Sequence, residues 1–154
     1  MLAGTNCMLE PCELCGEVVS WFAKESYQHT ALVGLDCFYP QLFAYSGGGV
    51  DRQLYKVSSG AETVGYVMTA SDFKFREFVI MHMCITASQQ GGGIGSAIVK
   101  YFQAHTLAHT ADFDRLWLDC TADKVAFFQR RGLSRTDKPP PAGGCLGLEW
   151  RPVL

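Results

Sequence analysis

Three runs of apolar residues follow one another between residues 52 and 86, and each has the length of a β-strand. Residues 52–57 and 62–70 carry β-branched and aromatic side chains, and Ser58-Ser59-Gly60 between them favours a turn. Residues 76–86 form a longer and more continuously apolar run, which is typical of a buried strand. The pattern predicts three consecutive strands in hairpin order.

After residue 92 the apolar positions change from the spacing of a strand to that of a helix, which predicts a long helix over residues 92–109. Its apolar face is formed by Ile94, Ala97, Ile98, Tyr101 and His105. The remaining predicted elements are a strand at 116–120, a helix at 125–131, a short strand at 133–136, a proline-rich loop at 137–144 and a strand at 145–150.

The N-terminal third of the chain is less regular. Residues 5–9 predict a short strand, and Pro11 suits the first position of a helix that ends near residue 26. Residues 29–45 indicate an irregular helical region, and the glycines of residues 46–49 indicate a flexible break. Taken in chain order, these elements predict an α/β fold with a mixed sheet.

Composition narrows the class of protein. A chain of 154 residues, 48% apolar and 18% charged, is expected to fold as one globular domain spanning residues 1–154. A net charge of −2 argues against broad binding to nucleic acid or to anionic membranes. No apolar run has the length of a membrane span, and the first 20 residues contain no Lys or Arg for a signal peptide. We therefore expect a cytoplasmic protein with no membrane partner.

The chain contains seven cysteines at irregular spacing, which in a reducing compartment are expected to be free thiols. Cys12 and Cys15 have the spacing of half a zinc site, and only His29 or Cys37 could complete it, at awkward separations. We favour the interpretation that Cys12 and Cys15 lie one turn apart on the first helix. No metal site is expected.

The segment from Met83 to Ser96 carries the strongest functional signal. An apolar strand is followed by a polar turn, and then by four glycines within five positions at the start of the long helix. The first N–H groups of a helix lack intrahelical partners, and the helix dipole places positive charge there. Glycines leave these groups bare, so the segment predicts a site for a phosphate-bearing ligand.

The spacing of the glycines argues against two common nucleotide sites. A nucleoside triphosphate loop needs Lys followed by Ser or Thr directly after its last glycine, whereas Ser96 and Ala97 follow Gly95. A dinucleotide loop needs Gly-x-Gly-x-x-Gly, and neither Gly91 nor Gly93 begins that pattern. Gln90, Gly93 and Gly95 do fit Gln-x-x-Gly-x-Gly, and with the preceding strand they resemble the coenzyme A loop of the GNAT superfamily of N-acetyltransferases.

A second stretch extends this resemblance over roughly residues 55–133. Residues 116–120 form a short apolar strand, and residues 122–133 are similar to the superfamily's later helix, which ends in Ala-x-x-Phe-Tyr-x-x-x-Gly-Phe. The resemblance implies a single-domain, mixed and mostly antiparallel sheet, splayed at its centre and flanked by helices. It also implies that acetyl-CoA is the cosubstrate. The implied contacts with it are Met83, Cys84, Ile85, Gln90, Gly91, Gly92, Gly93, Ile94, Gly95, Ser96 and Phe128.

The resemblance also implies direct transfer of an acetyl group from a thioester to an amine. The superfamily's usual acid is the tyrosine of its Phe-Tyr pair, and this position is Phe128 here, which has no proton to give. Cys120, at the end of the predicted strand at 116–120, is our candidate acid. Glu77 is the acidic residue on the strand that leads into the loop and is our candidate base, by analogy with the histone-acetyltransferase branch. His82 is the alternative base.

The sequence thus predicts an acetyl-CoA-dependent N-acetyltransferase that acts on a primary amine. A small amine or amino sugar is favoured over a protein lysine or N-terminus. Leu118-Asp119-Cys120 resembles a segment of glucosamine-6-phosphate N-acetyltransferases, although Met81-His82 replaces their Glu-Asp pair. A catalytically silent acyl-CoA-binding protein of the same fold is the alternative, and a scaffold without a coenzyme A site is a third possibility. We expect a monomer or homodimer.

Overall fold

The computed structural model describes residues 1–25, 51–136 and 145–153. The predicted helical region at 29–45, the glycine break at 46–49 and the proline-rich loop lie outside the described residues. Seven strands form a single sheet in the described part of the chain. They are β1 (Cys7–Cys12), β2 (Asp51–Ser59), β3 (Glu62–Asp72), β4 (Glu77–Ile85), β5 (Arg115–Thr121), β6 (Ser134–Arg135) and β7 (Cys145–Trp150).

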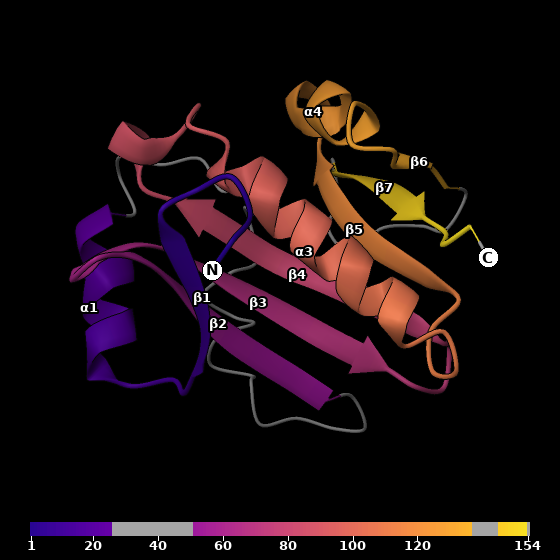
Figure 1. Cartoon of the computed structure of the whole chain (residues 1–154), viewed down its shortest axis with the longest axis horizontal. Helices are drawn as coiled ribbons and strands as arrows, with labels where there is room; N and C mark the ends of the chain where they lie inside the picture. Colours follow the sequence, from indigo (N-terminus) through magenta and orange to yellow (C-terminus); the bar gives the residue numbers. More distant parts are fainter. Residues whose placement is uncertain (26–50, 137–144, 154) are drawn as a thin grey trace.

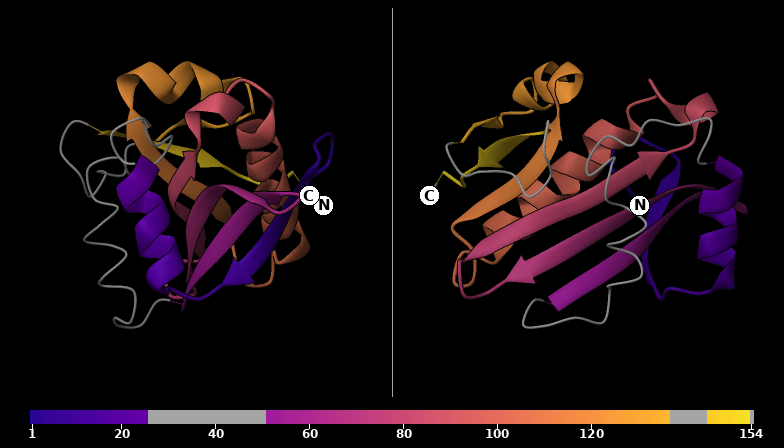
Figure 2. Two further views of the ribbon diagram at one scale, coloured as in Figure 1. Left: turned by 90° about the vertical axis from the view of Figure 1, so that its left-hand side faces the viewer. Right: turned by 180° about the vertical axis from the view of Figure 1, so that it is seen from behind.

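Helices cover both faces of this sheet (Figure 1). They are α1 (Gly16–Glu25), α3 (Ile94–Ala108) and α4 (Val125–Gln129), together with the short 3₁₀ segments η1 (Ala87–Gln89) and η2 (Ala122–Lys124). Figure 2 shows α1 on one face of the sheet and α3 on the other. Val18 of α1 packs with Leu54 and Met68, whereas Ile98 and Phe102 of α3 belong to the larger core on the opposite face.

The strands lie in the order β1-β2-β3-β4-β5-β7-β6. All neighbouring pairs are antiparallel except β4 and β5, which are parallel and are connected through α3. The parallel pairing covers only Glu77 to Ile80 of β4, against Arg115 to Leu118 of β5. Beyond it, β4 continues beside β3 to Ile85 and β5 continues beside β7 to Thr121. The sheet is therefore split at its centre, as the resemblance implied.

A β-bulge in β4 lies where this split begins. Met68 pairs with His82 and Thr69 pairs with Ile80, so Met81 is an additional residue in β4. A bulge bends its strand and increases the local twist, and this one lies directly after the last β4 residue that pairs with β5. It also changes which side chains share a face: Phe78 and Ile80 lie in the same core as Met83 and Ile85.

Two local predictions were wrong. Pro11 does not begin a helix; it lies in β1, opposite Tyr55, and α1 begins only at Gly16. β1 is an edge strand, which is a position in a sheet where proline is tolerated. Cys12 therefore ends a strand and Cys15 precedes the helix, so the two thiols do not lie one turn apart on it. The described residues contain no cluster of His, Cys, Asp and Glu suited to a metal ion.

The buried face of α3 also differs from the prediction at one position. Ile94, Ala97 and Ile98 are buried as expected, but Tyr101 is 45% exposed and Phe102 is fully buried in its place. Phe102 packs between the rings of Tyr55 and Phe78. None of the helices described here combines the length and the apolar character that crossing a bilayer requires.

His105, in the last turn of α3, provides a test of this packing. Its ring lies 4.7 Å from that of Phe78 and 4.3 Å from that of His109, between centroids. Burial lowers the pKa of His105 below its ordinary 6.5, and the nearby His109 lowers it further. The unfolded chain therefore binds a proton at this residue more readily than the folded protein does.

We expect the stability that His105 contributes to be fully present above about pH 6.5 and to be lost as the pH falls below that value. The melting temperature should then decrease between pH 7.5 and pH 5.5, and His105→Gln should reduce that decrease, because glutamine does not titrate. Thermal denaturation followed by circular dichroism across this pH range measures both proteins. Equal pH dependence in the two proteins would contradict the assignment.

Candidate active site

The loop between β4 and α3 folds as the glycine pattern suggests. Gly91 and Gly93 have φ angles of 84° and 87°, in the left-handed region where other residues are strained. Gly93 caps α3, and its carbonyl accepts the N–H of Ala97. The N–H groups of Ile94, Gly95 and Ser96 precede the first residue that can bond within the helix. They are free to bind an anion, which the helix dipole favours.

Gln90 attaches this loop to the end of β4. Its Nε2 donates a hydrogen bond of 2.9 Å to the carbonyl of Ile85. The N–H of Thr86 bonds to the carbonyl of Val64 in β3 at 2.8 Å, which fixes the point where the strand ends. The conformation of the loop is therefore set by the end of β4 on one side and by the start of α3 on the other.

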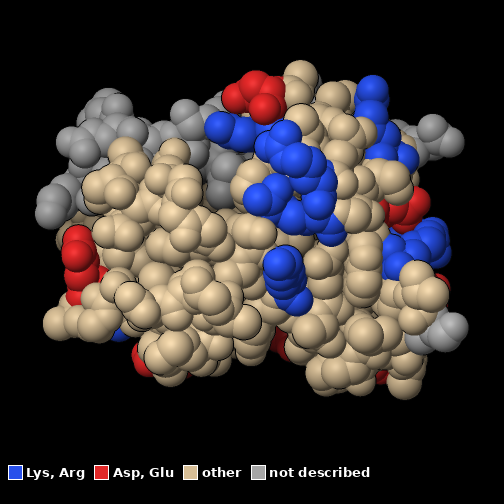
Figure 3. Space-filling model, turned by 45° about the horizontal axis from the view of Figure 1, so that its top comes forward, with Lys and Arg blue, Asp and Glu red and all other residues tan. Residues whose placement is uncertain are grey.

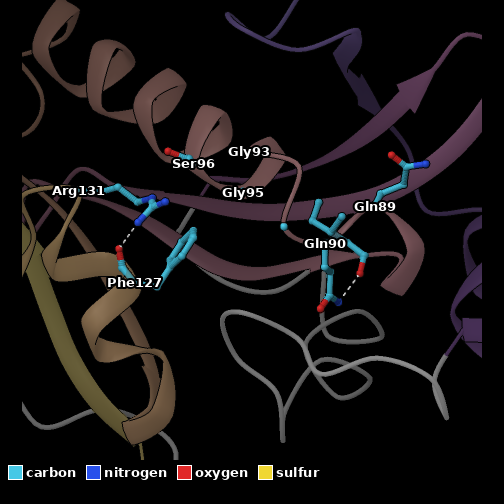
Figure 4. Close-up of a pocket in the computed structure, with 9 residues that line it drawn as sticks. Gln89, Gln90, Gly93, Gly95, Ser96, Phe127 and Arg131 are labelled. Atoms are coloured by element: carbon cyan, nitrogen blue, oxygen red, sulfur yellow. Dashed lines mark hydrogen bonds between the residues drawn. The ribbon is translucent and has the colours of Figure 1, made fainter.

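A cavity of about 350 Å³ opens between this loop and α4. Figure 4 shows the loop and the first turn of α3 on one side, with the side chains of Phe127 and Arg131 on the other. The lining residues are Ile85, Gln89, Gln90, Gly91, Gly93, Gly95, Ser96, Phe127 and Arg131. The cavity thus combines backbone donors, one cation and apolar surface at the open end of the split sheet.

Arg131 is held in place by Phe127. Its Nη1 donates a hydrogen bond of 2.6 Å to the carbonyl of Phe127, and its guanidinium lies 3.7 Å from the centroid of that ring. Burial lowers the pKa of Arg131, and repulsion from Arg130 lowers it further. A guanidinium keeps its charge in proteins, so a fixed cation faces the cavity.

Six of the predicted cofactor contacts line this cavity: Ile85, Gln90, Gly91, Gly93, Gly95 and Ser96. Gly92 and Ile94 line a smaller neighbouring hollow of about 240 Å³. Met83 and Cys84 are buried in β4 beyond its last pair with β5. Phe128 is fully buried in the core and does not line the cavity; Phe127 does.

Phe127, Arg131 and Gln89 were not among the predicted site residues. The signal for the first two was present, because an aromatic residue followed four positions later by Arg is a pair that meets on one helix face. The resemblance directed attention to the next residue, Phe128, and α4 is only five residues long. A turn this short gives no periodicity from which to choose between two adjacent phenylalanines.

The structure does not place Glu77 at this cavity. Glu77 and Ile85 are the two ends of β4, which separates them by roughly 26 Å at about 3.3 Å per residue. The side chain of Glu77 is 2% exposed, and its Oε2 lies 2.8 Å from Nη2 of Arg115. Arg115 also bonds to Glu149 at 3.0 Å. Glu77 thus belongs to a buried ion pair at the end of β4 that pairs with β5, away from the cavity, and its role as the base stays a prediction.

His82, Asp119 and Cys120 lie closer to the opening. They follow Ile80 and Leu118, the last paired residues of β4 and β5, and each of them is at most 4% exposed. Cys120 belongs to the core on the α3 side, where Phe128 also lies. The predicted alternative base and the candidate acid are therefore both beside the split, although neither lines the cavity described above.

A family model described as an acetyltransferase (GNAT) domain matches residues 37–151. No curated protein sequence matches the chain. A Bacillus subtilis acetyltransferase solved with CoA is 13% identical, with a TM-score of 0.67 over 96% of this chain and 99% of the other. A mutant spermidine N-acetyltransferase from Vibrio cholerae is 9% identical, with a TM-score of 0.66 over 95% and 94%.

The ribosomal-protein-S18-alanine N-acetyltransferase from Escherichia coli has the same fold, with 13% identity and a TM-score of 0.61 over 94% of each chain. At such identities the similarity establishes the fold, whereas the family model covers most of the sequence. The split sheet, the glycine loop and the family match lead to one conclusion: the chain belongs to the GNAT family of acetyltransferases.

Proposed function

We propose that the protein is an acetyl-CoA-dependent N-acetyltransferase that transfers an acetyl group directly to a primary amine. The observation that carries this proposal is the cavity at the open end of the split sheet. It places the free N–H groups of the α3 N-terminus opposite Arg131, a combination suited to a diphosphate. The structures solved with acetyl-CoA or CoA among proteins of this fold support the same ligand.

The residues present fit coenzyme A. Gly91, Gly93 and Gly95 leave the backbone accessible, and Arg131 supplies positive charge on the opposite side. Residues Met83 to Ile85 of β4 lie beyond its last pair with β5, and we expect the pantetheine arm to run along this part of β4 as an added strand would. Bound there, acetyl-CoA supplies an activated acyl group with a thiolate as its leaving group.

The reaction requires three tasks of the chain. A base removes a proton from the ammonium, so that the amine nitrogen can form a bond to the acetyl carbon. Backbone N–H groups near Cys84 and Ile85 stabilise the oxyanion until the carbon–sulfur bond breaks. The departing thiolate then takes a proton from Cys120 or from water. With Glu77 placed in an ion pair, we assign the base to His82, which lies beside the split.

The acceptor is proposed to be a small amine or amino sugar in preference to a protein amine. Proteins of the same fold include enzymes named for spermidine and for the alanine of a ribosomal protein, so the fold accommodates both classes. The cytoplasmic location and the monomeric or homodimeric state stay predictions.

Free thiol release tests this function. The protein, acetyl-CoA and a panel of amines are mixed, with polyamines, amino sugars and lysine-containing peptides represented, and thiol formation is followed with a chromogenic disulfide. We expect release with at least one amine, at a rate that depends on amine concentration. Calorimetry with CoA, run in parallel, reports binding independently of turnover.

A silent acyl-CoA-binding protein is the second candidate, and Phe128 is the observation that favours it. This residue occupies the position of the family's tyrosine and is fully buried, so no hydroxyl is presented to the leaving group. Binding of CoA without thiol release on any amine would favour this candidate. Binding of neither CoA nor acetyl-CoA would contradict both and would leave a scaffold.

A further inference from the structure

A second hollow, with a volume of about 380 Å³, adjoins the first cavity. It is lined by Ser96, Lys100, Gln103, Arg130 and Arg131. Ser96 and Arg131 belong to both cavities, so the two spaces share a wall. Figure 3 shows Lys and Arg side chains gathered across this face of the molecule. The second hollow is therefore strongly basic, in a chain whose net charge is −2.

The elements around this hollow hold its charges together. Ser96, Lys100 and Gln103 are spaced i, i+4 and i+7 on α3, which places them on one side of the helix. Gln103 Nε2 donates a hydrogen bond of 2.8 Å to the carbonyl of Arg131, which ties α3 to the turn after α4. Arg131 is fixed by Phe127, as described above.

The cations of this hollow lack acidic partners. No ion pair within residues 1–25, 51–136 and 145–153 involves Lys100, Arg130 or Arg131. Repulsion between Arg130 and Arg131 is large enough to contribute to the lowered pKa of Arg131. Binding of a dianion would relieve this repulsion, and each charge-assisted hydrogen bond would add to the affinity.

We propose that this hollow is a phosphomonoester subsite and that it holds the ribose 3′-phosphate of coenzyme A on Lys100 and Arg130. The inference rests on the proposed function, because it takes the diphosphate to lie in the first cavity. Lys100 lies about 6 Å further along the axis of α3 than Ser96, at 1.5 Å per residue. A 3′-phosphate lies one sugar away from the diphosphate, so adjoining anion sites with a shared wall match the two groups.

The subsite would select the acyl donor. A thioester carried on free coenzyme A has the 3′-phosphate, whereas a thioester on a protein-bound phosphopantetheine arm lacks the whole nucleotide. The hollow therefore favours coenzyme A over carrier-protein donors without any contact to the acyl group. Lys100 and Arg130 would then bind the 3′-phosphate, whereas the glycine loop binds the diphosphate without them.

Calorimetric titration with CoA and with 3′-dephospho-CoA tests the proposal, and it needs no turnover. Wild-type protein is expected to bind CoA roughly tenfold or more tightly than 3′-dephospho-CoA, because hydrogen bonds to a charged group are lost with the phosphate. The double variant Lys100→Gln and Arg130→Gln should bind both ligands with the wild-type affinity for 3′-dephospho-CoA. Lys74→Gln, in the turn between β3 and β4, is the matched control and should keep the preference.

The outcomes separate this inference from the function on which it rests. If wild-type protein binds both ligands equally, the subsite is wrong and the coenzyme A site stands. If the double variant retains the preference for CoA, the 3′-phosphate is held by other residues and the assignment fails. If neither ligand binds to wild-type protein, the proposed function fails together with the subsite. Circular dichroism of each variant confirms that it is folded.

Discussion

Replacing Gly93 with valine should weaken the binding of coenzyme A by roughly a hundredfold. Gly93 has a φ of 87° and caps α3, so a β-branched residue would force the loop out of its conformation. The N–H groups of Ile94, Gly95 and Ser96 would then no longer converge on one anion. Loss of about 3 kcal/mol of binding free energy corresponds to roughly a hundredfold weaker affinity. Isothermal calorimetry with CoA measures the change.

Gly60→Val is the matched control for this experiment. Gly60 also has a positive φ, of 61°, and an added Cβ at either glycine would meet nothing within 4 Å. Both substitutions should therefore lower the melting temperature by a similar amount, because both strain a turn. Only Gly93→Val should lower the affinity for CoA. Equal affinity in the two variants would show that the glycine loop does not hold the ligand.

Replacing Arg115 with methionine should be among the most destabilising single changes in the described part of the chain. Glu77 is nearly inaccessible to solvent, and its carboxylate would lose the guanidinium 2.8 Å away. Burial lowers the pKa of Arg115, but its hydrogen bonds and charge interactions with Glu149 and Glu77 raise that pKa overall. This is expected of a cation held by two carboxylates. Removing one partner of a buried pair costs about 3 kcal/mol, and we expect a decrease of roughly 6–12 °C in melting temperature.

Arg151→Met provides the comparison, because Arg151 contacts the same Glu149 at 3.3 Å but is 59% exposed. Exposed pairs contribute about 0–1 kcal/mol, so its melting temperature should stay close to that of the wild type. Differential scanning calorimetry measures all three proteins. Similar decreases for Arg115→Met and Arg151→Met would mean that the Glu77 pair does not stabilise the fold.

Glu77 can stabilise the fold through this ion pair or act as the general base, and the two roles predict different effects of a substitution. If it stabilises the closed end of the split, Glu77→Gln should lower stability and leave the rate of thiol release per folded molecule within about twofold of wild type. A general base would behave in the opposite way, with a loss of 10²–10⁴ in rate. Such a loss, in a protein with wild-type melting behaviour, would restore Glu77 as the base.

The parts of the fold that the sequence predicted are those in which local chemistry leaves few alternatives. Gly91 and Gly93 take positive φ angles, and the apolar period over residues 94–108 belongs to a real helix. The loop was therefore found at its correct position between β4 and α3. The sequence does not predict the opposite wall of the cavity, because Phe127 and Arg131 approach the loop only through the tertiary packing of α4.

The errors come from features that a local pattern cannot express. The bulge at Met81 shifts the alternation of side chains in β4. Counting every second residue from Glu77 therefore gives the wrong face of the strand near the loop. Pro11 has the same local preferences at the start of a helix as on the edge of a sheet, and only the pairing with β2 distinguishes the two. Phe102 is buried instead of Tyr101 because its ring packs against the rings of Tyr55 and Phe78.

The proposed activity depends on one contact, between the backbone of the glycine loop and a diphosphate, and a crystal structure with acetyl-CoA tests it directly. We expect the diphosphate oxygens within hydrogen-bond distance of the N–H groups of Gly93 to Ser96, with Arg131 on the opposite side and the pantetheine arm beside Met83 to Ile85. The thioester carbon should then lie in the split between β4 and β5. A nucleotide bound elsewhere, with the loop at residues 90–96 unoccupied, would contradict the account.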